Sequence, residues 1–248
     1  MKISEVIYNC LNTIVTWILV ILLGIAGLYA GYALWDNNRI YQQAENVQDS
    51  LLDLKPDTDN EANFARLREI NPDVCAWITL DGTEIDYPVV MGEDLRTYLN
   101  TDVYGNYALA GSIFADNRCA RDFSDPYTLI YGHHMTRHRM FGDLELYEDS
   151  RFFRDHRTGT LILPGESHEL TILACIKRSA SDPMIFDPKQ TSENITALLE
   201  SVESDSVQLD GNTAVRAEEL PESRILALST CSGSYEDART IVLCLVEE

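Results

Sequence analysis

The hydrophobic pattern of the chain begins with one long apolar stretch near the N-terminus. Residues 14–34 read IVTWILVILLGIAGLYAGYAL, and no charged residue occurs from Val6 to Trp35. A helix of this length is long enough to cross about 30 Å of hydrocarbon. A cleaved signal peptide is the alternative, because Ala30 and Gly31 supply small residues, but the run exceeds the usual apolar core of such peptides. The pattern therefore predicts an uncleaved transmembrane anchor within residues 1–35.

The charges that flank this anchor indicate its orientation only weakly, because Lys2 precedes it and Arg39 follows it. A short cytoplasmic N-terminus with the rest of the chain outside is the simpler topology. We therefore expect a single-pass protein of the cell membrane whose large domain is extracellular.

After the anchor the apolar positions keep a helical spacing through a polar stretch, which predicts a helix that continues out of the membrane. The sequence KPDTD at 55–59 ends it. A second short helix is indicated by Phe64, Leu67 and Ile70, and Asn71 followed by a proline ends that helix. Residues 36–73 are therefore interpreted as a juxtamembrane helical segment.

From Val74 onward the pattern changes to short apolar and β-branched runs that are separated by turn residues, which predicts strands. The runs are CAWITL (75–80), IDYPVV (85–90), GSIFAD (111–116), YTLIYGHH (127–134), GTLILP (159–164), ELTILACIKR (169–178), RILALSTC (224–231) and RTIVLCLV (239–246). Helical patterns interrupt them at 94–99, 140–147, 151–157 and 192–203. Because helices do not alternate regularly with the strands, a doubly wound parallel sheet is disfavoured. We expect a mainly β, mostly antiparallel closed barrel of about eight strands over residues 74–248.

Composition narrows the function classes. The chain has 248 residues, 45% of them hydrophobic, which is enough to form a hydrophobic core. Its net charge of −21 excludes nucleic acid as a partner, because binding to phosphates needs a concentrated positive patch. The six cysteines show neither a CxxC pair nor a Cys/His ligand spacing, so no metal site, redox pair or cofactor is predicted. Five extracellular cysteines could form two disulfides or none. Those within apolar runs, Cys75, Cys175 and Cys244, are typical of buried thiols.

Two residues near the C-terminus carry candidate chemistry. Cys231 ends an apolar run just before the turn residues SGS, where a thiol could emerge at a barrel rim and act as a nucleophile. Arg239 opens the next run, and a turn between them would bring guanidinium and thiol to the same end, where the arginine could stabilise an oxyanion. Each also has an ordinary explanation: a core cysteine at a strand end, and a surface arginine paired with Glu236 or Asp237.

His133 supplies a third candidate, because it ends another apolar run where a polar loop begins. Histidine is suited to protonate a departing amine near neutral pH. A solvated loop histidine is equally compatible with this position. His134 and His138 are rivals that spacing alone does not separate.

Several segments together resemble the signatures of sortases, most closely those of class B. They are YGHHM (131–135), MFGDL (140–144) and LSTC (228–231) with Arg239, supported by IDYPVV (85–90), YL (98–99), YGNY (104–107) and AGSIFAD (110–116). The match runs from about Asn71 to the C-terminus. It implies a closed sortase barrel with N-terminal helices and a helix in the insertion before the last two strands. The chain departs from the class at Leu95 and His134, where asparagine is common.

The resemblance also implies a function: a membrane-anchored cysteine transpeptidase that cuts a C-terminal sorting motif after Thr. Carried over by position, Cys231 is the nucleophile and His133, which directly follows Tyr-Gly, is the general acid and base. Arg239 holds the oxyanion, and Ser229 and Thr230 line the substrate groove beside the nucleophile.

The expected partners are a surface protein bearing a sorting motif of the Asn-Pro-X-Thr type and an amine of a lipid-linked peptidoglycan precursor. A pilus-polymerising sortase that uses a pilin lysine, and a Cys-His peptidase that transfers the acyl group to water, are alternatives.

Overall fold

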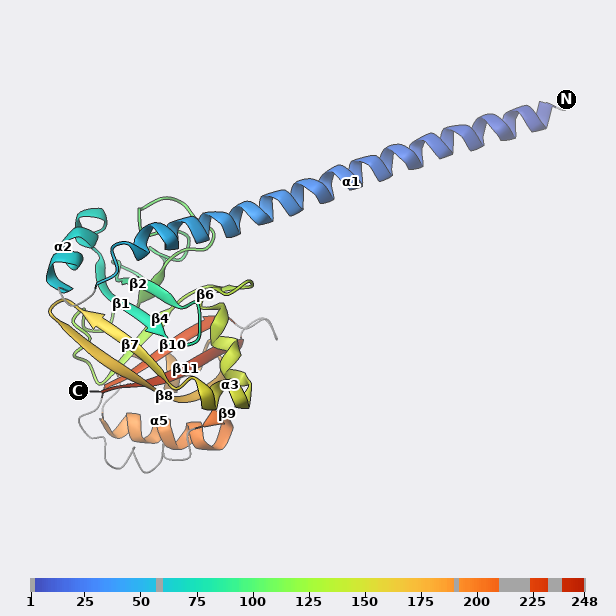
Figure 1. Ribbon diagram of the computed structural model, residues 1–248. Helices are drawn as coiled ribbons and strands as arrows, with labels where there is room; N and C mark the ends of the chain where they lie inside the picture. Colours follow the sequence, from blue (N-terminus) through green and yellow to red (C-terminus); the bar gives the residue numbers. More distant parts are fainter. Residues whose placement is uncertain (1–2, 57–59, 190–191, 210–223, 232–237, 248) are drawn as a thin grey trace. The chain divides into compact units, whose positions relative to one another are not determined.

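The protein is described by a computed structural model that covers residues 3–56, 60–189, 192–209, 224–231 and 238–247 (Figure 1). It divides into two compact units, Met1–Gln42 and Gln43–Glu248. The first unit is the N-terminal part of helix α1, which runs from Ile3 to Leu52 without a break at the expected boundary after residue 35. By length and composition this helix can cross a membrane: its most apolar 18-residue window has a mean hydropathy of 2.3, and none of that window is buried. Insertion and orientation stay predictions.

The second unit is built on eight strands that close into a barrel, as the sequence predicts. Their order is β11-β10-β4-β3-β2-β1-β7-β8, and β8 pairs back with β11. The strands are β1 (Val74–Leu80), β2 (Asp86–Val90), β3 (Ile113–Ala115), β4 (Tyr127–Tyr131), β7 (Thr158–Leu163), β8 (Glu166–Ser179), β10 (Arg224–Cys231) and β11 (Ala238–Val246). Each coincides with one of the eight apolar runs. The barrel is mostly antiparallel, but β2–β3 and β4–β10 are parallel.

Short elements decorate this barrel. A hairpin of β5 (His134–Met135) and β6 (Arg139–Met140) follows β4, and β9 (Ser206–Leu209) pairs with β8. The helices are α2 (Asn60–Ile70), the 3-10 helix η1 (Gly142–Glu148), α3 (Ser150–Asp155), α4 (Pro183–Phe186) and α5 (Ser192–Asp205). Asp149 caps α3 by accepting from the backbone N–H groups of Arg151 and Phe152. The expected helices at 140–147, 151–157 and 192–203 are thus confirmed with shifted ends.

The helix expected at 94–99 is wrong. The Asp94 side chain accepts from the backbone N–H groups of Arg96 and Thr97, as an N-cap would, but only turns follow. The reason lies at Tyr98, whose ring is buried and whose hydroxyl bonds Asn71 and Asp73. These contacts direct the chain inward before a second helical turn can form.

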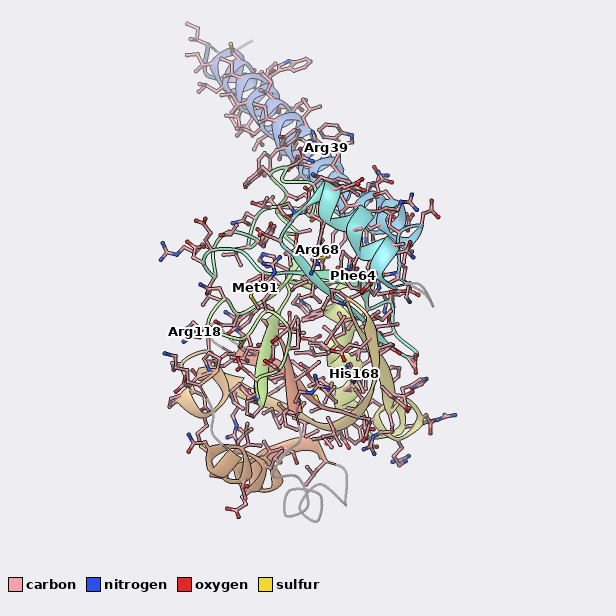
Figure 2. All side chains as sticks on the ribbon, turned by 90° about the vertical axis from the view of Figure 1, so that its left-hand side faces the viewer. Arg39, Phe64, Arg68, Met91, Arg118 and His168 are labelled. Atoms are coloured by element: carbon pink, nitrogen blue, oxygen red, sulfur yellow. The ribbon has the colours of Figure 1, made fainter. Side chains whose placement is uncertain are left out.

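Helices cover the barrel at two places. The stripe Ile195, Leu198, Leu199 and Val202 of α5 packs on a core cluster from β4, β8, β10 and β11, as its spacing predicts. On the other side Phe64 and Leu67 of α2 pack with Leu51 and Trp77. Arg68, beside Phe64 in Figure 2, donates to the Val74 carbonyl at 3.1 Å. Burying one leucine, isoleucine, valine or phenylalanine side chain contributes about 1.5–3 kcal/mol, so these apolar contacts hold both helices on the barrel.

Candidate active site

Strands β4 and β10 end, and strand β11 begins, at the same end of the barrel. In the parallel pair of β4 and β10, Ser229 lies opposite Tyr131, so Cys231 and His133 each follow a paired residue by two positions. In the antiparallel pair of β10 and β11, Cys231 lies opposite Arg239. Because parallel strands run in the same direction, their carboxyl ends meet at one edge. The backbone thus brings the three predicted residues to one end of the barrel.

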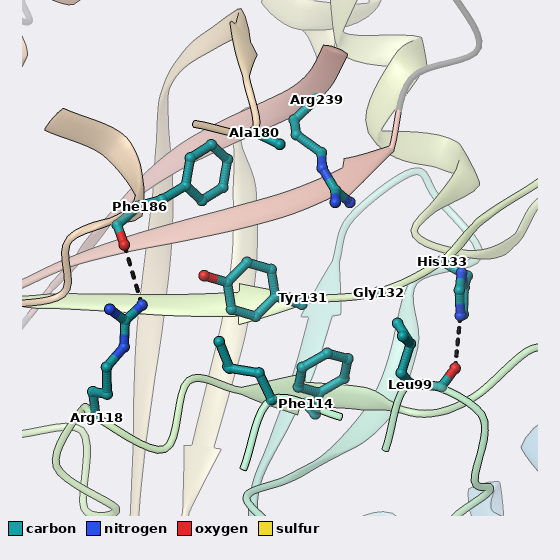
Figure 3. A pocket seen from close by; sticks show the side chains of 10 residues that line it. Leu99, Phe114, Arg118, Tyr131, Gly132, His133, Ala180, Phe186 and Arg239 are labelled. Carbon is teal, nitrogen blue, oxygen red and sulfur yellow. Dashed lines mark hydrogen bonds between the residues drawn. The ribbon is translucent and has the colours of Figure 1, made fainter. Parts of the chain in front are cut away.

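A groove with a volume of about 580 Å³ opens at this end (Figure 3). Its lining is mainly apolar and aromatic, with two arginines and one histidine: Leu95, Leu99, Phe114, Arg118, Tyr131, Gly132, His133, Ala180, Phe186 and Arg239. Three rings form one wall, with centroids 5.4 Å apart for Phe114–Tyr131 and 6.4 Å apart for Tyr131–Phe186. A mainly apolar groove with a few polar groups is typical of a ligand-binding site.

His133 is the histidine of the groove. Its Nε2 lies 2.7 Å from the carbonyl oxygen of Leu99, and its own carbonyl accepts from Phe141 N–H at 3.1 Å. His134 instead pairs with Glu145 at 3.1 Å, and His138 Nδ1 lies 2.7 Å from Asp143. Neither rival is part of the groove lining. The geometry therefore favours His133 among the three sequence candidates.

Arg239 lines the groove from the start of β11. The side chain of Cys231 and residues 232–237 lie outside the described part of the structure, and with them the turn and the expected partners Glu236 and Asp237. The backbone pairing of Cys231 with Arg239 is described, and it puts the two residues directly across an antiparallel ladder.

Four other cysteines are free thiols buried in the barrel unit: Cys75, Cys119, Cys175 and Cys244. Burial raises the pKa of Cys75 and Cys175 to about 12 and that of Cys119 to about 11, from a usual 9.0. It also raises the pKa of Cys244. A thiol with such a pKa stays protonated near neutral pH and is a poor nucleophile. These four positions therefore do not compete with Cys231 for a catalytic role.

Ser229 and Thr230 are both fully buried and are not part of the groove lining. Their hydroxyls have no hydrogen-bond partner among the described residues. The expectation that they line the groove floor thus gains no support from their surroundings and stays a prediction. No group of three or more metal-binding side chains occurs in the described ranges.

An ion pair between a buried carboxylate, Asp116, and a partly exposed arginine, Arg118, lies in the groove region and was not predicted from the sequence. Asp116 has no exposed surface, and Arg118 donates to its two oxygens through Nε at 2.9 Å and Nη2 at 2.7 Å. Tyr131 also donates to Asp116, at 3.2 Å. Hydrogen bonding to Asp116 raises the pKa of Arg118, and burial raises that of Tyr131, so one stays cationic and the other neutral. The spacing D-x-R after a strand was the available signal.

Arg118 also connects the loop after β3 to helix α4, on which Phe186 lies. Arg118 Nη2 donates to the Phe186 carbonyl of α4 at 3.1 Å, drawn as a dashed line in Figure 3. The insertion between β8 and β10 is thereby attached to the loop that follows β3. Two cationic side chains, Arg118 and Arg239, thus line the groove together with the aromatic rings.

Comparison with known proteins gives a consistent result, although no protein-family model matches the chain. The sortase B of Listeria monocytogenes is 33% identical over 178 residues, which cover 71% of this chain and 70% of that protein. A class B sortase of Streptococcus pyogenes involved in pilus biogenesis has a TM-score of 0.65 and 36% identity, over 74% of this chain and 97% of that one. A mutant form of Clostridium perfringens sortase B has a TM-score of 0.72 and 27% identity, over 81% and 97%.

The identity to the Listeria protein extends across most of both chains, and the barrel that carries the groove is the barrel of solved class B sortases. With sequence and fold in agreement, the chain belongs to the class B sortases, enzymes of the sortase transpeptidase type.

Proposed function

We propose that this chain cleaves a C-terminal sorting motif after Thr and transfers the new acyl end to an amine of a cell-wall precursor. Cys231 is the nucleophile, His133 the general acid and base, and Arg239 the group that holds the reacting carbonyl. The helix α1 anchors the enzyme in the membrane with the barrel outside, where secreted substrates and lipid-linked precursors both arrive.

The first half-reaction forms a thioester. The Cys231 thiolate attacks the carbonyl carbon of the motif Thr, and the tetrahedral oxyanion accepts hydrogen bonds from the Arg239 guanidinium. The C–N bond then breaks as His133 protonates the leaving amine. The products are an acyl-enzyme and the released C-terminal peptide.

The second half-reaction reverses these roles. An incoming amine gives its proton to His133 as it attacks the thioester carbon, and Arg239 again holds the oxyanion. Collapse of this intermediate forms an amide bond and regenerates the thiolate. Because a thioester is reactive enough to acylate an amine, the exchange requires no nucleotide.

The observation that carries this proposal is the shared end of β4, β10 and β11. Cys231 pairs with Arg239 across one ladder, and His133 follows the neighbouring parallel strand at the matching height. His133 and Arg239 also line one groove. A nucleophile, a proton carrier and a cation at one end of the barrel, beside an apolar groove, are what acyl transfer from a peptide requires.

A pilus-polymerising sortase is the second candidate. It is favoured by the similarity to the Streptococcus pyogenes enzyme, which is involved in pilus biogenesis. In this case the acceptor would be a lysine amine of a second protein subunit, and the first half-reaction would be unchanged. A peptidase that transfers the acyl group to water is the third candidate.

The test uses the full chain in detergent with a library of Asn-Pro-X-Thr peptides and two acceptors, a wall-precursor amine and a lysine peptide. Mass spectrometry should detect an acyl adduct on Cys231 and an amide product with one acceptor. Cys231→Ala should abolish both, whereas Cys175→Ala, at a buried thiol, should retain them. Hydrolysis without any amide product would contradict transpeptidation, and turnover by Cys231→Ala would contradict the assigned nucleophile.

A further inference from the structure

The hydrogen bond between His133 and Leu99 fixes which ring nitrogen carries a hydrogen. His133 Nε2 lies 2.7 Å from the Leu99 carbonyl oxygen (Figure 3). A carbonyl oxygen only accepts hydrogen bonds, so Nε2 must donate in both the neutral and the cationic ring. The proton that His133 gains and loses during a reaction is therefore carried by Nδ1.

We propose that the backbone carbonyl of Leu99 is the positioning group of His133. It selects the Nε2–H tautomer, holds the plane of the ring, and leaves Nδ1 to exchange protons with the thiol and the amines. In many acyl-transfer enzymes a carboxylate or amide side chain performs this task. The tautomer assignment stands on the hydrogen bond alone, whereas its catalytic consequence rests on the proposed function.

The carbonyl is held in place from several directions. The buried Tyr98 ring is anchored through its hydroxyl to Asn71 and Asp73, and the Tyr98 carbonyl accepts from Ser112 N–H at 3.1 Å. On the other side the Asn100 carbonyl accepts from Ala108 N–H at 3.0 Å. Residues on both sides of Leu99 are thus tied to neighbouring segments, so its carbonyl is fixed before substrate arrives.

Gly111 leaves the room that this carbonyl occupies. A Cβ atom on Gly111 would lie 2.5 Å from the Leu99 oxygen and 2.6 Å from the Tyr98 oxygen, closer than real Cβ contacts. Its φ of +59° also favours glycine. Gly111→Ala must therefore displace the acceptor of His133.

The chain offers a matched control in the same region. Gly105 has a φ of +82°, but a Cβ atom there would meet nothing within 4 Å. Gly105→Ala therefore introduces a comparable backbone strain without touching the Leu99 carbonyl. Comparing the two alanine variants separates the effect of the carbonyl from that of the left-handed conformation.

The experiment combines histidine 15N NMR with kinetics on the full chain in detergent. The His133 signals are assigned by their loss in His133→Gln. In the wild-type protein the neutral ring should show the Nε2–H tautomer. Gly111→Ala should shift the ring toward a tautomer mixture and lower kcat about tenfold or more, with a smaller change in KM. Gly105→Ala should leave the spectrum and kcat unchanged.

Two results would overturn the proposal. One is a wild-type His133 that carries its hydrogen on Nδ1, which decides the matter even if Gly111→Ala fails to fold. The other is a folded Gly111→Ala protein with an unchanged tautomer and kcat. If the chain shows the expected tautomer but no acyl transfer with any peptide, the proposed function fails and the tautomer assignment stands.

Discussion

The guanidinium of Arg139 donates to the carboxylate of Glu45 at 2.6 Å, which joins the hairpin after His133 to the C-terminal part of α1. Arg139 also donates to the side-chain oxygen of Gln48 at 3.3 Å. Tyr87 donates to the same oxygen at 2.8 Å and accepts from Met140 N–H at 2.9 Å. Gln48 is buried at the centre of this network, and its amide donates to the Glu84 carbonyl at 3.1 Å.

The hairpin needs such support because its backbone is strained. Arg137, His138 and Met140 all have positive φ values, of 61°, 58° and 53°. For residues other than glycine this conformation costs about 1–2 kcal/mol each. The contacts to α1 and to Tyr87 hold the hairpin in this form, and the hairpin in turn follows directly after His133.

Gln48→Ala should therefore destabilise the barrel unit by about 1–3 kcal/mol, because it leaves the Tyr87 hydroxyl and the Glu84 carbonyl without their buried partner. Urea unfolding of the full chain in detergent measures this difference. Asn46→Ala, at an exposed position of the same helix, is the control and should change the stability little. Equal stabilities for the two variants would show that the helix does not support the hairpin.

The ion pair of Asp116 and Arg118 should behave as a coupled unit. Arg118→Ala removes both guanidinium donors from a fully buried carboxylate and leaves it only the Tyr131 hydroxyl and the backbone N–H of residue 118, which should cost about 1–3 kcal/mol. Asp116→Asn removes the negative charge that Arg118 neutralises. The loss of unfolding free energy in the double variant should therefore be smaller, by at least about 1 kcal/mol, than the sum of the losses in the two single variants. Thermal or urea unfolding of the four proteins gives this cycle. Simple additivity would contradict the coupling.

Stability should fall above about pH 9, where the unfolded chain begins to release thiol protons that the folded barrel retains. Burial raises the folded-state pKa of Cys75 and Cys175 to about 12, from 9.0. Their contribution is therefore complete below pH 9 and is lost as the pH rises toward 12, by about 1.4 kcal/mol per pH unit for each group. Cys175→Ala should make the slope of unfolding free energy against pH less steep by about 1.4 kcal/mol per pH unit, which corresponds to one proton. Parallel slopes for variant and wild type would refute this assignment.

Arg239→Lys keeps a positive charge but loses the forked donors, so it should lower kcat/KM about tenfold to hundredfold. Turnover of a sorting-motif peptide with an amine acceptor measures the loss. Arg151→Lys serves as control, because Arg151 is exposed on α3 and pairs only with Asp155 of the same helix among the described contacts. Near-normal turnover by Arg239→Lys would mean that a single point charge suffices.

Much of the fold was predictable because its determinants are local. Each barrel strand coincides with a short apolar run, and α5 follows the stripe that begins at Ile195. The parallel pairing of β4 with β10 was not predictable, because strands about a hundred residues apart leave no trace of their register in a single sequence. Yet that pairing is what aligns His133 with Cys231. The turn between their strands already indicated that Cys231 and Arg239 share one end, whereas the position of His133 beside them could not be derived.

The supporting groups were harder to find, because they act through the backbone or against expected local structure. Leu99 contributes a carbonyl, which every residue has, and it lies in a stretch whose pattern indicated a helix. Gln48 occupies a helix position that looks polar and solvated in the sequence, although it is buried. In both cases the role of the residue depends on tertiary contacts, and the hydrophobic periodicity of a sequence does not reveal such contacts.

The register of β10 makes the number of residues in this strand a determinant of the candidate active site. Ser229 lies opposite Tyr131 on one side and opposite Ile241 on the other, so the strand is locked between two neighbours. Deleting one residue between Ile225 and Leu228 would leave an apolar run that still forms a strand. Every later residue of the strand would then lie on the opposite face of the sheet. Substitutions in this strand can be tolerated by repacking, whereas a one-residue gap cannot.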